Sequence, residues 1–330
     1  MTEAVGYRRS VVGAASTGSA ADSMAATLVV EDMGVGRHEH AYVVSVRRGA
    51  ILLLAVFAAA WATAAAVSAP PARVQIRVLR LVDYSRRAHF RNGAAGPRVL
   101  VTYVRYSARG HAPFPLVVFG HGFALAPQIY ALLLDAWARA GYVVATPVFP
   151  VENANAPGGP DQSDLRNEPG DISFVISRLI GPTSPLGSLV DPKKIAVAGQ
   201  SDGAVAALSV AYDRRFLDRR IDAAVILSGA VLGGFTQPPP GSPPLLAVQG
   251  TRDPINGPSA TTDYYRLMRQ PKFLLWLLGA THLPPYTTSD RWAVVVDRAT
   301  TAFLDHYLRG APLRPLLAAG TQTGIARITS

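Results

Sequence analysis

The chain begins to show a regular pattern of apolar and polar residues at about residue 74. Residues 74–82 and 99–106 alternate between apolar and polar with a period of two, and a turn containing Gly and Pro at 93–97 separates them. A period of two places every second side chain on the same face, which is typical of a half-buried β-strand. The pattern therefore predicts an antiparallel hairpin at the start of the folded region.

From residue 115 onward, short and continuously apolar runs alternate with stretches of helical periodicity. The apolar runs lie at 115–120, 142–146, 195–199, 223–228, 245–249 and 273–278. The helical stretches lie at 127–141, at 171–180, from 201 onward, at 261–268 and at 292–308. Strands that are apolar on both faces are typical of a parallel sheet covered by helices. The alternation predicts an α/β fold in one domain, with a mostly parallel central sheet of about eight strands and helices on both faces.

The part of the chain before residue 70 has a different character. Residues 1–46 are rich in Ala, Gly, Ser and Thr with little periodicity, so we expect a disordered extension. Residues 47–69 begin with two arginines, continue as an uncharged apolar run and end in small residues, which is typical of an export signal. The run is almost long enough to span a bilayer, so an uncleaved membrane anchor is the alternative, and a buried core helix is a third. We expect residues 70–330 to form a secreted or membrane-anchored domain outside the cytoplasm.

Composition excludes several kinds of chemistry. The chain has 330 residues and no cysteine, so it has no disulfide, no cysteine metal ligand and no cysteine nucleophile. Its formal net charge is +10, yet no cluster of arginines is interleaved with aromatic residues. We therefore expect a basic, solvated surface and no nucleic-acid partner. No motif in the sequence requires a metal or a cofactor.

The sequence IAVAGQSDGAVAAL at residues 195–208 predicts a strand, a sharp turn and a helix. Ser201 lies in the turn, with Gly199 two residues before it and Gly203 two residues after it. A serine in such a turn adopts a strained backbone conformation that exposes its hydroxyl, and the glycines leave room for that conformation. The partly positive N-terminus of the following helix favours an oxyanion beside the serine. Ser201 is therefore the candidate nucleophile.

A serine nucleophile requires a base and a residue that orients the base. The carboxyl ends of parallel strands meet at one edge of a sheet, so these residues are sought directly after predicted strands. Asp253 follows the fifth of the apolar runs, and His282 follows the sixth. His306 is the alternative base, but it lies within a predicted helix. The order Ser201, Asp253, His282 predicts a catalytic triad mounted on an α/β sheet.

The turn after the first apolar run, Gly120-His121-Gly122-Phe123, is a candidate oxyanion hole. Gly120 and Gly122 allow a tight turn in which the amide of Phe123 faces the reacting carbonyl group. The amide of Asp202, directly after the nucleophile, would supply the second donor. His121 precedes the serine and lies within this turn, so we expect a structural histidine there.

These motifs and their order resemble the α/β-hydrolase superfamily over about residues 73–310. The resemblance rests on FGHGF at 119–123, GYVVATP at 141–147, GQSDGA at 199–204, GTRDP at 250–254 and GATH at 279–282. The pattern is most similar to lidless secreted esterases, the group around chlorophyllases, bacterial polyester hydrolases and platelet-activating-factor acetylhydrolases. The resemblance implies an α/β-hydrolase fold and an ester hydrolase with Ser201, Asp253 and His282 as its triad. The dienelactone-hydrolase branch, which uses Cys, is excluded by composition.

Two positions depart from the pattern of these esterases. Gln200 stands where they often have His, and Asp202 stands where they often have Met or Arg. A carboxylate at 202, beside the oxyanion hole, would disfavour anionic acyl groups or slow the chemistry. Residues 229–244 are rich in Pro and Gly, so we expect no substantial cap domain and an open site. The candidate substrate-lining residues are the aromatic side chains Tyr130, Phe149, Phe235 and Tyr286.

The sequence thus predicts a serine hydrolase that cleaves a carboxylic ester through an acyl-enzyme intermediate. The substrate would be a small-molecule, lipid or polymer ester, with membrane attachment through residues 49–69 if that segment is an anchor. An acyltransferase that delivers the acyl group to an envelope sugar or lipid would use the same triad, as would a peptidase. A non-catalytic binding protein with the same fold is a further alternative.

Overall fold

The residues with period-two alternation form the antiparallel hairpin that opens the folded part of the chain. The computed structural model describes residues 72–330. Strands β1 (Val74–His89) and β2 (Ala95–Ser107) pair antiparallel, with a shift of register between Asp83 and Arg87. The predicted hairpin is confirmed, and both of its strands are longer than the runs that predicted them.

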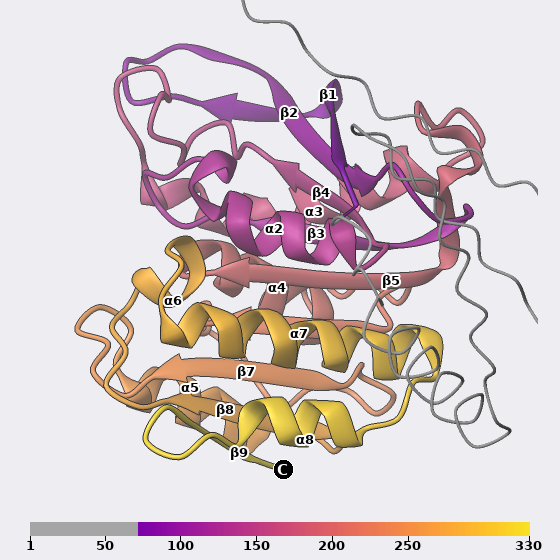
Figure 1. Cartoon of the computed structure of the whole chain (residues 1–330). Coiled ribbons are helices and arrows are strands. Elements are labelled where there is room, and N and C mark those ends of the chain that lie inside the picture. Colours follow the sequence, from indigo (N-terminus) through magenta and orange to yellow (C-terminus); the bar gives the residue numbers. More distant parts are fainter. Residues whose placement is uncertain (1–71) are drawn as a thin grey trace, which may run out of the picture. The chain divides into compact units, whose positions relative to one another are not determined.

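The continuously apolar runs form the parallel part of a nine-stranded sheet (Figure 1). Its strand order is β1-β2-β4-β3-β5-β6-β7-β8-β9. Strands β3 to β8 are parallel to one another, whereas β2 is antiparallel to β4, and β9 is antiparallel to β8. The bounds are β3 Phe114–Gly120, β4 Val143–Pro147, β5 Val190–Gln200, β6 Ala223–Leu227, β7 Leu245–Gly250, β8 Lys272–Leu277 and β9 Ala326–Thr329. The predicted mostly parallel sheet is confirmed, with the short edge strand β9 added to it.

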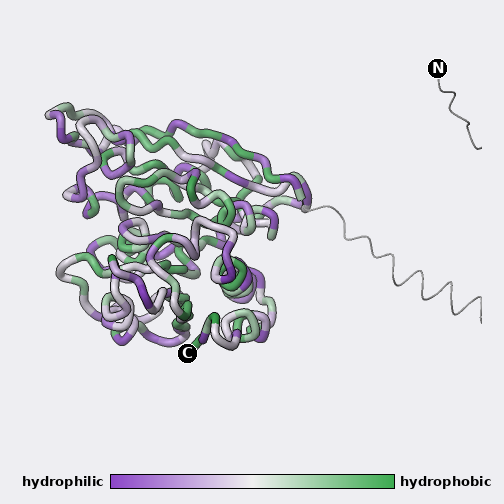
Figure 2. The backbone as a smooth tube through the Cα atoms, turned by 60° about the vertical axis from the view of Figure 1, so that its left-hand side comes forward, coloured by the Kyte–Doolittle hydropathy of each residue, from purple (hydrophilic) through white to green (hydrophobic). Residues whose placement is uncertain are grey.

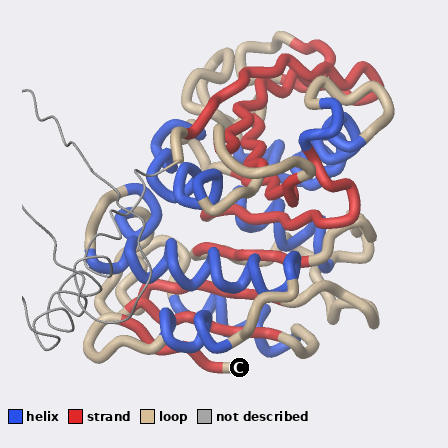
Figure 3. The backbone as a smooth tube through the Cα atoms, turned by 45° about the vertical axis from the view of Figure 1, so that its right-hand side comes forward, coloured by secondary structure: helices blue, strands red, loops and turns tan. Residues whose placement is uncertain are grey.

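Helices cover both faces of this sheet (Figures 1 and 3). One layer contains α2, α6, α7 and α8, and the other contains α3, α4 and α5. The bounds are α2 Ala131–Arg139, α3 Glu168–Ile180, α4 Asp202–Tyr212, α5 Pro258–Leu267, α6 Pro284–Thr287, α7 Arg291–Arg309 and α8 Arg314–Gly320. Three short 3-10 helices are η1 Pro127–Tyr130, η2 Gln162–Asn167 and η3 Gly187–Leu189. Helices α6 and α8 were not predicted.

Successive side chains of the parallel strands enter two hydrophobic cores, one on each face. Along β3, Val117 and Phe119 pack with the layer of α2 and α7, whereas Leu116 and Val118 pack with the layer of α3 and α4. Helix α4 is buried along its whole length, which explains why it is built largely from Ala, Gly and Val. Hydrophobic segments accordingly run through the interior, and hydrophilic ones concentrate on the outer loops (Figure 2).

The predicted helix at 127–141 differs from the structure in its first turn. That turn is the 3-10 helix η1, and the α-helix proper begins at Ala131. Because a 3-10 helix has about three residues per turn, it rotates the side chains away from the face that α-helical spacing predicts. Ile129 and Leu132, which fit the α-helical spacing of a core-facing stripe, are 37% and 48% exposed, whereas Tyr130 is fully buried. Leu133 and Trp137, which fit the same spacing and lie in the α-helix proper, are buried.

The carboxyl ends of the parallel strands lie at one edge of the sheet and are followed by the loops that carry the candidate site. The turn after β3, the elbow after β5 and the loops after β7 and β8 therefore come together, although they are far apart in the sequence. Residues 229–244, between β6 and β7, contain no helix. This agrees with the prediction that no helical cap is inserted at this position.

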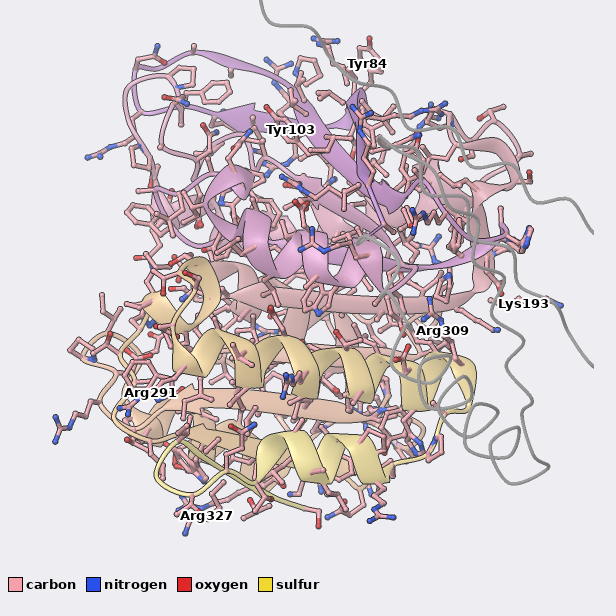
Figure 4. All side chains as sticks on the ribbon, viewed as in Figure 1. Tyr84, Tyr103, Lys193, Arg291, Arg309 and Arg327 are labelled. Atoms are coloured by element: carbon pink, nitrogen blue, oxygen red, sulfur yellow. The ribbon has the colours of Figure 1, made fainter. Side chains whose placement is uncertain are left out.

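The predicted N-terminal extension at 1–46 and the predicted export signal or anchor at 47–69 lie outside the described residues. Within residues 72–330, no helix is both long enough and apolar enough to cross a membrane. Basic side chains are spread over the surface rather than gathered: Lys193, Arg291 and Arg327 project at well-separated positions (Figure 4).

Candidate active site

Ser201 lies in a tight turn between strand β5 and helix α4. Its backbone has φ 56° and ψ −123°, a strained conformation for a residue with a side chain. A Cβ atom added to Gly199 would overlap the backbone of Gly203, and one added to Gly203 would overlap the backbone of Gly120. The predicted elbow and turn glycines are therefore the residues that let α4 cross β3 and β5 at contact distance. This close crossing fixes the turn that presents the Ser201 hydroxyl.

The structure brings Ser201, His282 and Asp253 into one hydrogen-bonded row. The Oγ of Ser201 lies 2.9 Å from the Nε2 of His282, and the Nδ1 of His282 lies 2.8 Å from the Oδ2 of Asp253. The carboxylate of Asp253 can only accept a hydrogen bond, so the neutral imidazole of His282 carries its proton on Nδ1. Its Nε2 is then free to accept from the serine hydroxyl. The alternative base, His306, instead bonds through its Nδ1 to the carbonyl oxygen of Ala311.

Asp253 is held as a carboxylate by the loop that follows β7. Its Oδ1 accepts hydrogen bonds from the backbone N–H groups of Ile255 and Asn256 at 2.9 and 3.0 Å. Burial alone would raise the pKa of Asp253, but the hydrogen bonds from His282 and from the Ile255 amide outweigh burial and lower it. The side chain therefore remains ionised and able to orient His282.

Two residues that the sequence did not indicate hold this loop in place. The Nε2 of Gln249 donates to the carbonyl oxygens of Gly250 and Asn256 at 3.0 and 2.9 Å. The Nδ2 of Asn256 donates to the carbonyl oxygen of Ser228 at 2.8 Å, which ties the Asp253 loop to the end of β6. Their partners lie up to 28 residues away, so no local pattern marks them.

The Phe123 amide, in the turn after β3, is available for a ligand, whereas three neighbouring amides are hydrogen-bonded within the protein. The N–H of Gly122 donates to the Tyr130 hydroxyl at 3.1 Å, that of Ala124 donates to the carbonyl oxygen of Glu152 at 2.8 Å, and that of Leu125 donates to the carbonyl oxygen of Gly122 at 3.2 Å. Within residues 72–330, the Phe123 amide has no acceptor. The amide of Asp202, at the start of α4, likewise lacks an acceptor among the described residues. These are the two donors that the sequence predicted for an oxyanion hole.

His121 is a structural residue of this turn. It is fully buried, and the Phe149 amide donates to its Nε2 at 3.0 Å. Its Nδ1–H can then donate to the carbonyl oxygen of Gly122, 2.9 Å away. Burial lowers the pKa of His121 to about 4, so the ring is neutral near pH 7. One hydrogen bond within the turn and one from the segment after β4 therefore hold the ring, as expected of a structural histidine.

Carboxyl groups gather behind the elbow. The Oδ2 of Asp202 accepts a hydrogen bond from the Nε2 of Gln162 at 2.6 Å. Burial raises the pKa of Asp202, and burial together with the charge of Asp202 raises the pKa of Glu152 to about 8. Glu168 is also fully buried, and burial and the neighbouring Glu152 raise its pKa. Neither glutamate was singled out from the sequence, because only the folded chain places them side by side.

Most of the predicted substrate-lining residues do not line an open surface. Tyr130, Phe149 and Tyr286 have at most 1% of their surface exposed, so these three predictions are corrected. Phe235 is half-buried against the core that contains α3, α4 and α5. These aromatic residues follow the motif residues closely in the sequence, but their side chains pack into the core. Helices cover both faces of the sheet, and the rings fill the space between helices and sheet. Phe123, in the turn after β3, is an aromatic side chain with an exposed surface at this edge.

A groove lies away from the row of Ser201, His282 and Asp253. Its volume is about 610 Å³, and it is lined by residues of α2, α7 and α8 together with the link that joins α7 to α8. No triad residue lines it. In the part of the chain that the structure describes, no three His, Asp or Glu side chains are arranged to bind a metal ion.

Comparison with known proteins yields a structural likeness. No protein-family model matches the chain, and no curated protein matches its sequence. Among solved structures it is similar to a ferulic acid esterase from Streptomyces cinnamoneus, with 26% sequence identity and a TM-score of 0.59. The match covers 74% of this chain and 94% of that one. Together with the order and direction of the strands, this likeness shows the α/β-hydrolase fold that the sequence predicted.

Proposed function

We propose that this protein is a serine hydrolase that cleaves a carboxylic ester through an acyl-enzyme intermediate. The observation that carries the proposal is the hydrogen-bonded row in which Ser201 faces His282 and His282 faces Asp253. The structural likeness to a ferulic acid esterase supports a small-molecule ester as the substrate. The lidless secreted esterases remain the subgroup that the motifs resemble.

Each residue of the site has a defined part in the proposed reaction. The Nε2 of His282 accepts the proton of the Ser201 hydroxyl as Oγ attacks the ester carbonyl carbon. The negative charge that develops on the carbonyl oxygen is bound by the amides of Phe123 and Asp202. Asp253 orients the imidazole ring and stabilises the imidazolium cation. This division of roles is the one that the geometry of the row and the two free amides support.

The remaining steps of the proposed reaction release the alcohol and then regenerate the serine. His282 gives its proton to the leaving alcohol oxygen, the C–O bond of the ester breaks, and the acyl group stays on Ser201. A water molecule then attacks the acyl carbon while His282 accepts its proton. The bond between the acyl carbon and the Ser201 oxygen breaks, the carboxylic acid leaves, and the proton on His282 returns to the Ser201 oxygen.

We propose residues 70–330 as the catalytic domain, with the preceding segment as an export signal or a membrane anchor. The basis is the change of composition at residue 70, together with the sheet and helices formed by the described residues. A position outside the cytoplasm follows if residues 47–69 act as proposed.

The proposal is tested with the purified full-length chain. The protein is incubated with a fluorophosphonate probe, and turnover of short p-nitrophenyl esters and of methyl ferulate is measured. We expect the probe to label Ser201, and Ser201→Ala to lower kcat by at least about 10⁴-fold. Ser209→Ala is the matched control, because Ser209 is a buried serine of α4 whose Oγ has no hydrogen-bond partner among the described residues.

The acid of the triad is tested in the same way. Asp253→Asn is expected to lower kcat strongly, because the amide would not stabilise the required tautomer of His282. Asp263→Asn removes an exposed carboxylate of α5 and is expected to match the parent. If Ser201 stays unlabelled and Ser201→Ala retains the turnover of the parent, the protein does not use this site as a serine hydrolase.

A further inference from the structure

We propose that Tyr130 and Gln200 form a positioning pair that holds the oxyanion-hole turn and the catalytic base in a fixed relation. This inference rests on the proposed function of the site. The pair joins the turn after β3, the end of β5 and the loop after β8, and neither side chain supplies an atom that forms or breaks a bond in the proposed reaction. Its expected effect is therefore on the rate of the chemical step and not on the binding of the substrate.

The pair lies in a continuous path of buried hydrogen bonds that runs from Gly122 to His282. The Gly122 amide donates to the Tyr130 hydroxyl at 3.1 Å, and this hydroxyl donates to the Oε1 of Gln200 at 2.8 Å. The Nε2 of Gln200 then donates to the carbonyl oxygen of His282 at 3.2 Å. Tyr130 and Gln200 are fully buried, so water does not compete for these bonds.

The chemistry of the partners fixes the direction of every bond in the path. The carbonyl oxygen of His282 only accepts, so the amide nitrogen of Gln200 must face it and the amide oxygen must face Tyr130. The Tyr130 hydroxyl accepts from the Gly122 amide and has its single proton left for Gln200. Burial raises the pKa of Tyr130, which keeps that proton on the hydroxyl near pH 7.

One end of the path sets the direction of the free Phe123 amide. The carbonyl oxygen of Gly122 is within reach of the His121 Nδ1 at 2.9 Å, and it accepts from the Leu125 amide at 3.2 Å. This carbonyl and the Phe123 N–H belong to the same planar peptide unit and point in opposite directions. With its amide on Tyr130 and its carbonyl bound on the other side, Gly122 is held at both ends, so the Phe123 N–H keeps one direction.

The other end of the path sets the place of the base. Besides its bond to the His282 carbonyl oxygen, the Nε2 of Gln200 lies 3.2 Å from the His282 Nε2, the ring atom that faces Ser201. Gln200 therefore contacts both the backbone and the ring of His282. A shift of either by a fraction of an ångström would alter the alignment of Nε2 with Ser201 Oγ, and proton transfer is sensitive to that alignment.

Close packing makes the arrangement specific to the residues that form it. A Cβ atom on Gly122 would lie 2.9 Å from the Oε1 of Gln200 and 3.2 Å from the Cβ of Ser201. A side chain at residue 122 would therefore crowd the Gln200 amide, and glycine avoids this. The ring of Tyr130 packs on Phe119 of β3, with centroids 4.9 Å apart, which holds its hydroxyl in position.

The experiment compares Tyr130→Phe, Gln200→Met and the double variant with the parent, all as full-length chains. The fluorophosphonate probe counts active sites in each preparation, so kcat refers to folded, competent molecules. We expect each single variant to lower kcat by about tenfold while KM stays within about twofold. Because the two side chains act through one path, we expect the kcat of the double variant to be at most about twofold below that of the less active single variant.

Tyr212→Phe is the matched control. Tyr212 is a buried tyrosine of α4 whose hydroxyl donates to the carbonyl oxygen of Pro244 at 3.1 Å, away from the catalytic loops. The Tyr212→Phe variant loses a buried hydroxyl, as Tyr130→Phe does. We therefore expect it to have reduced thermal stability and an unchanged kcat per titrated site.

The proposal is overturned if both single variants keep the parent's kcat per titrated site, or if their losses multiply in the double variant. A lower yield of active sites at unchanged kcat also overturns it, because the pair would then be structural only. If one single variant does not fold, the other is judged alone by the same kcat and KM criteria. Failure of the proposed function is seen separately, as a parent protein that is not labelled at Ser201 and has no turnover.

Discussion

Asp202 places a carboxylate directly beside the candidate nucleophile. Its backbone amide is one of the two predicted donors without an acceptor among the described residues. The residue is 8% exposed, and its carboxylate would carry negative charge close to the reacting carbonyl group. The Gln162 amide donates to one carboxylate oxygen, while burial raises the pKa of Asp202. The residue therefore combines a donor that favours an oxyanion with a charge that disfavours any further anion.

Because of this charge, we expect the enzyme to act more slowly on esters whose acyl group is itself anionic. We expect Asp202→Asn to raise the ratio of kcat/KM for a succinate monoester over an acetate ester by about fivefold. The reason is the loss of a repulsion of ~1 kcal/mol, the size expected between two unit charges about 4 Å apart when water screens them. Steady-state kinetics on the two esters give the ratio, and taking a ratio cancels effects on the oxyanion common to both. An unchanged ratio, equal to that of the surface control Asp263→Asn, would contradict the prediction.

At the scale of single residues, the sequence located backbone positions better than side-chain surroundings. Ser201, Asp253 and His282 were predicted to meet because each directly follows a strand, and the structure brings them together. The predicted lining residues Tyr130 and Phe149 are buried instead. Whether an aromatic ring faces a ligand or the core depends on how helices cover the sheet, and no local pattern contains that information.

Among the elements, a buried ion network ties the hairpin to helix α3. Arg98 of β2 is fully buried and donates from its Nε to Asp171 of α3 at 2.7 Å and from its Nη1 to Asp164 of η2 at 2.9 Å. Arg86 of β1 adds an ion pair to Asp171 at 2.8 Å. Because Gln162 of η2 also contacts Asp202, this network fixes the loop that lies beside the elbow.

Breaking this network is expected to be costly. Arg98→Met leaves two buried carboxylates without their main partner, and we expect the free energy of unfolding to fall by about 3–5 kcal/mol. Urea denaturation followed by circular dichroism measures this change. Arg266→Met is the control, because Arg266 forms an exposed pair with Asp263 that is worth at most about 0.5 kcal/mol. Equal and small effects of the two substitutions would show that the buried network does not stabilise the fold.

Element types were predictable from periodicity, whereas several boundaries and small elements were not. The continuous apolar runs identified β3 to β8 because strands buried on both faces need no polar positions. Strand β9, which has four residues, is too short for its alternation to be distinguished from a loop. The 3-10 turn η1 was missed because its apolar residues also fit α-helical spacing.

For the molecule as a whole, the buried pair Glu152 and Glu168 links stability to pH. Both side chains are fully buried, and their carboxyl oxygens have no hydrogen-bond partner elsewhere in residues 72–330. Burial and the charge of Asp202 raise the pKa of Glu152 from 4.5 to about 8. Between these two values the folded protein holds a proton that the unfolded chain has released, so its stability falls as the pH rises through this window.

Glu152→Gln is expected to remove much of this dependence. The amide is neutral at every pH, so the variant should gain about 2 kcal/mol of unfolding free energy relative to the parent between about pH 5 and about pH 8. Denaturation at several pH values measures the difference. The exposed control Asp263→Asn should show the pH dependence of the parent. A Glu152→Gln curve parallel to that of the parent would mean that the pair titrates alike in the folded and unfolded chain.

The crossing of α4 over β3 and β5 also limits how the gene for this protein can vary. A glycine codon tolerates any change at its third base, whereas a change at the first or second base introduces a side chain or a stop signal. At Gly199 and Gly203 every such side chain would overlap neighbouring backbone. We therefore expect amino-acid changes at these two codons to be tolerated as rarely as changes at the Ser201 codon, although the glycines supply no atom to the reaction.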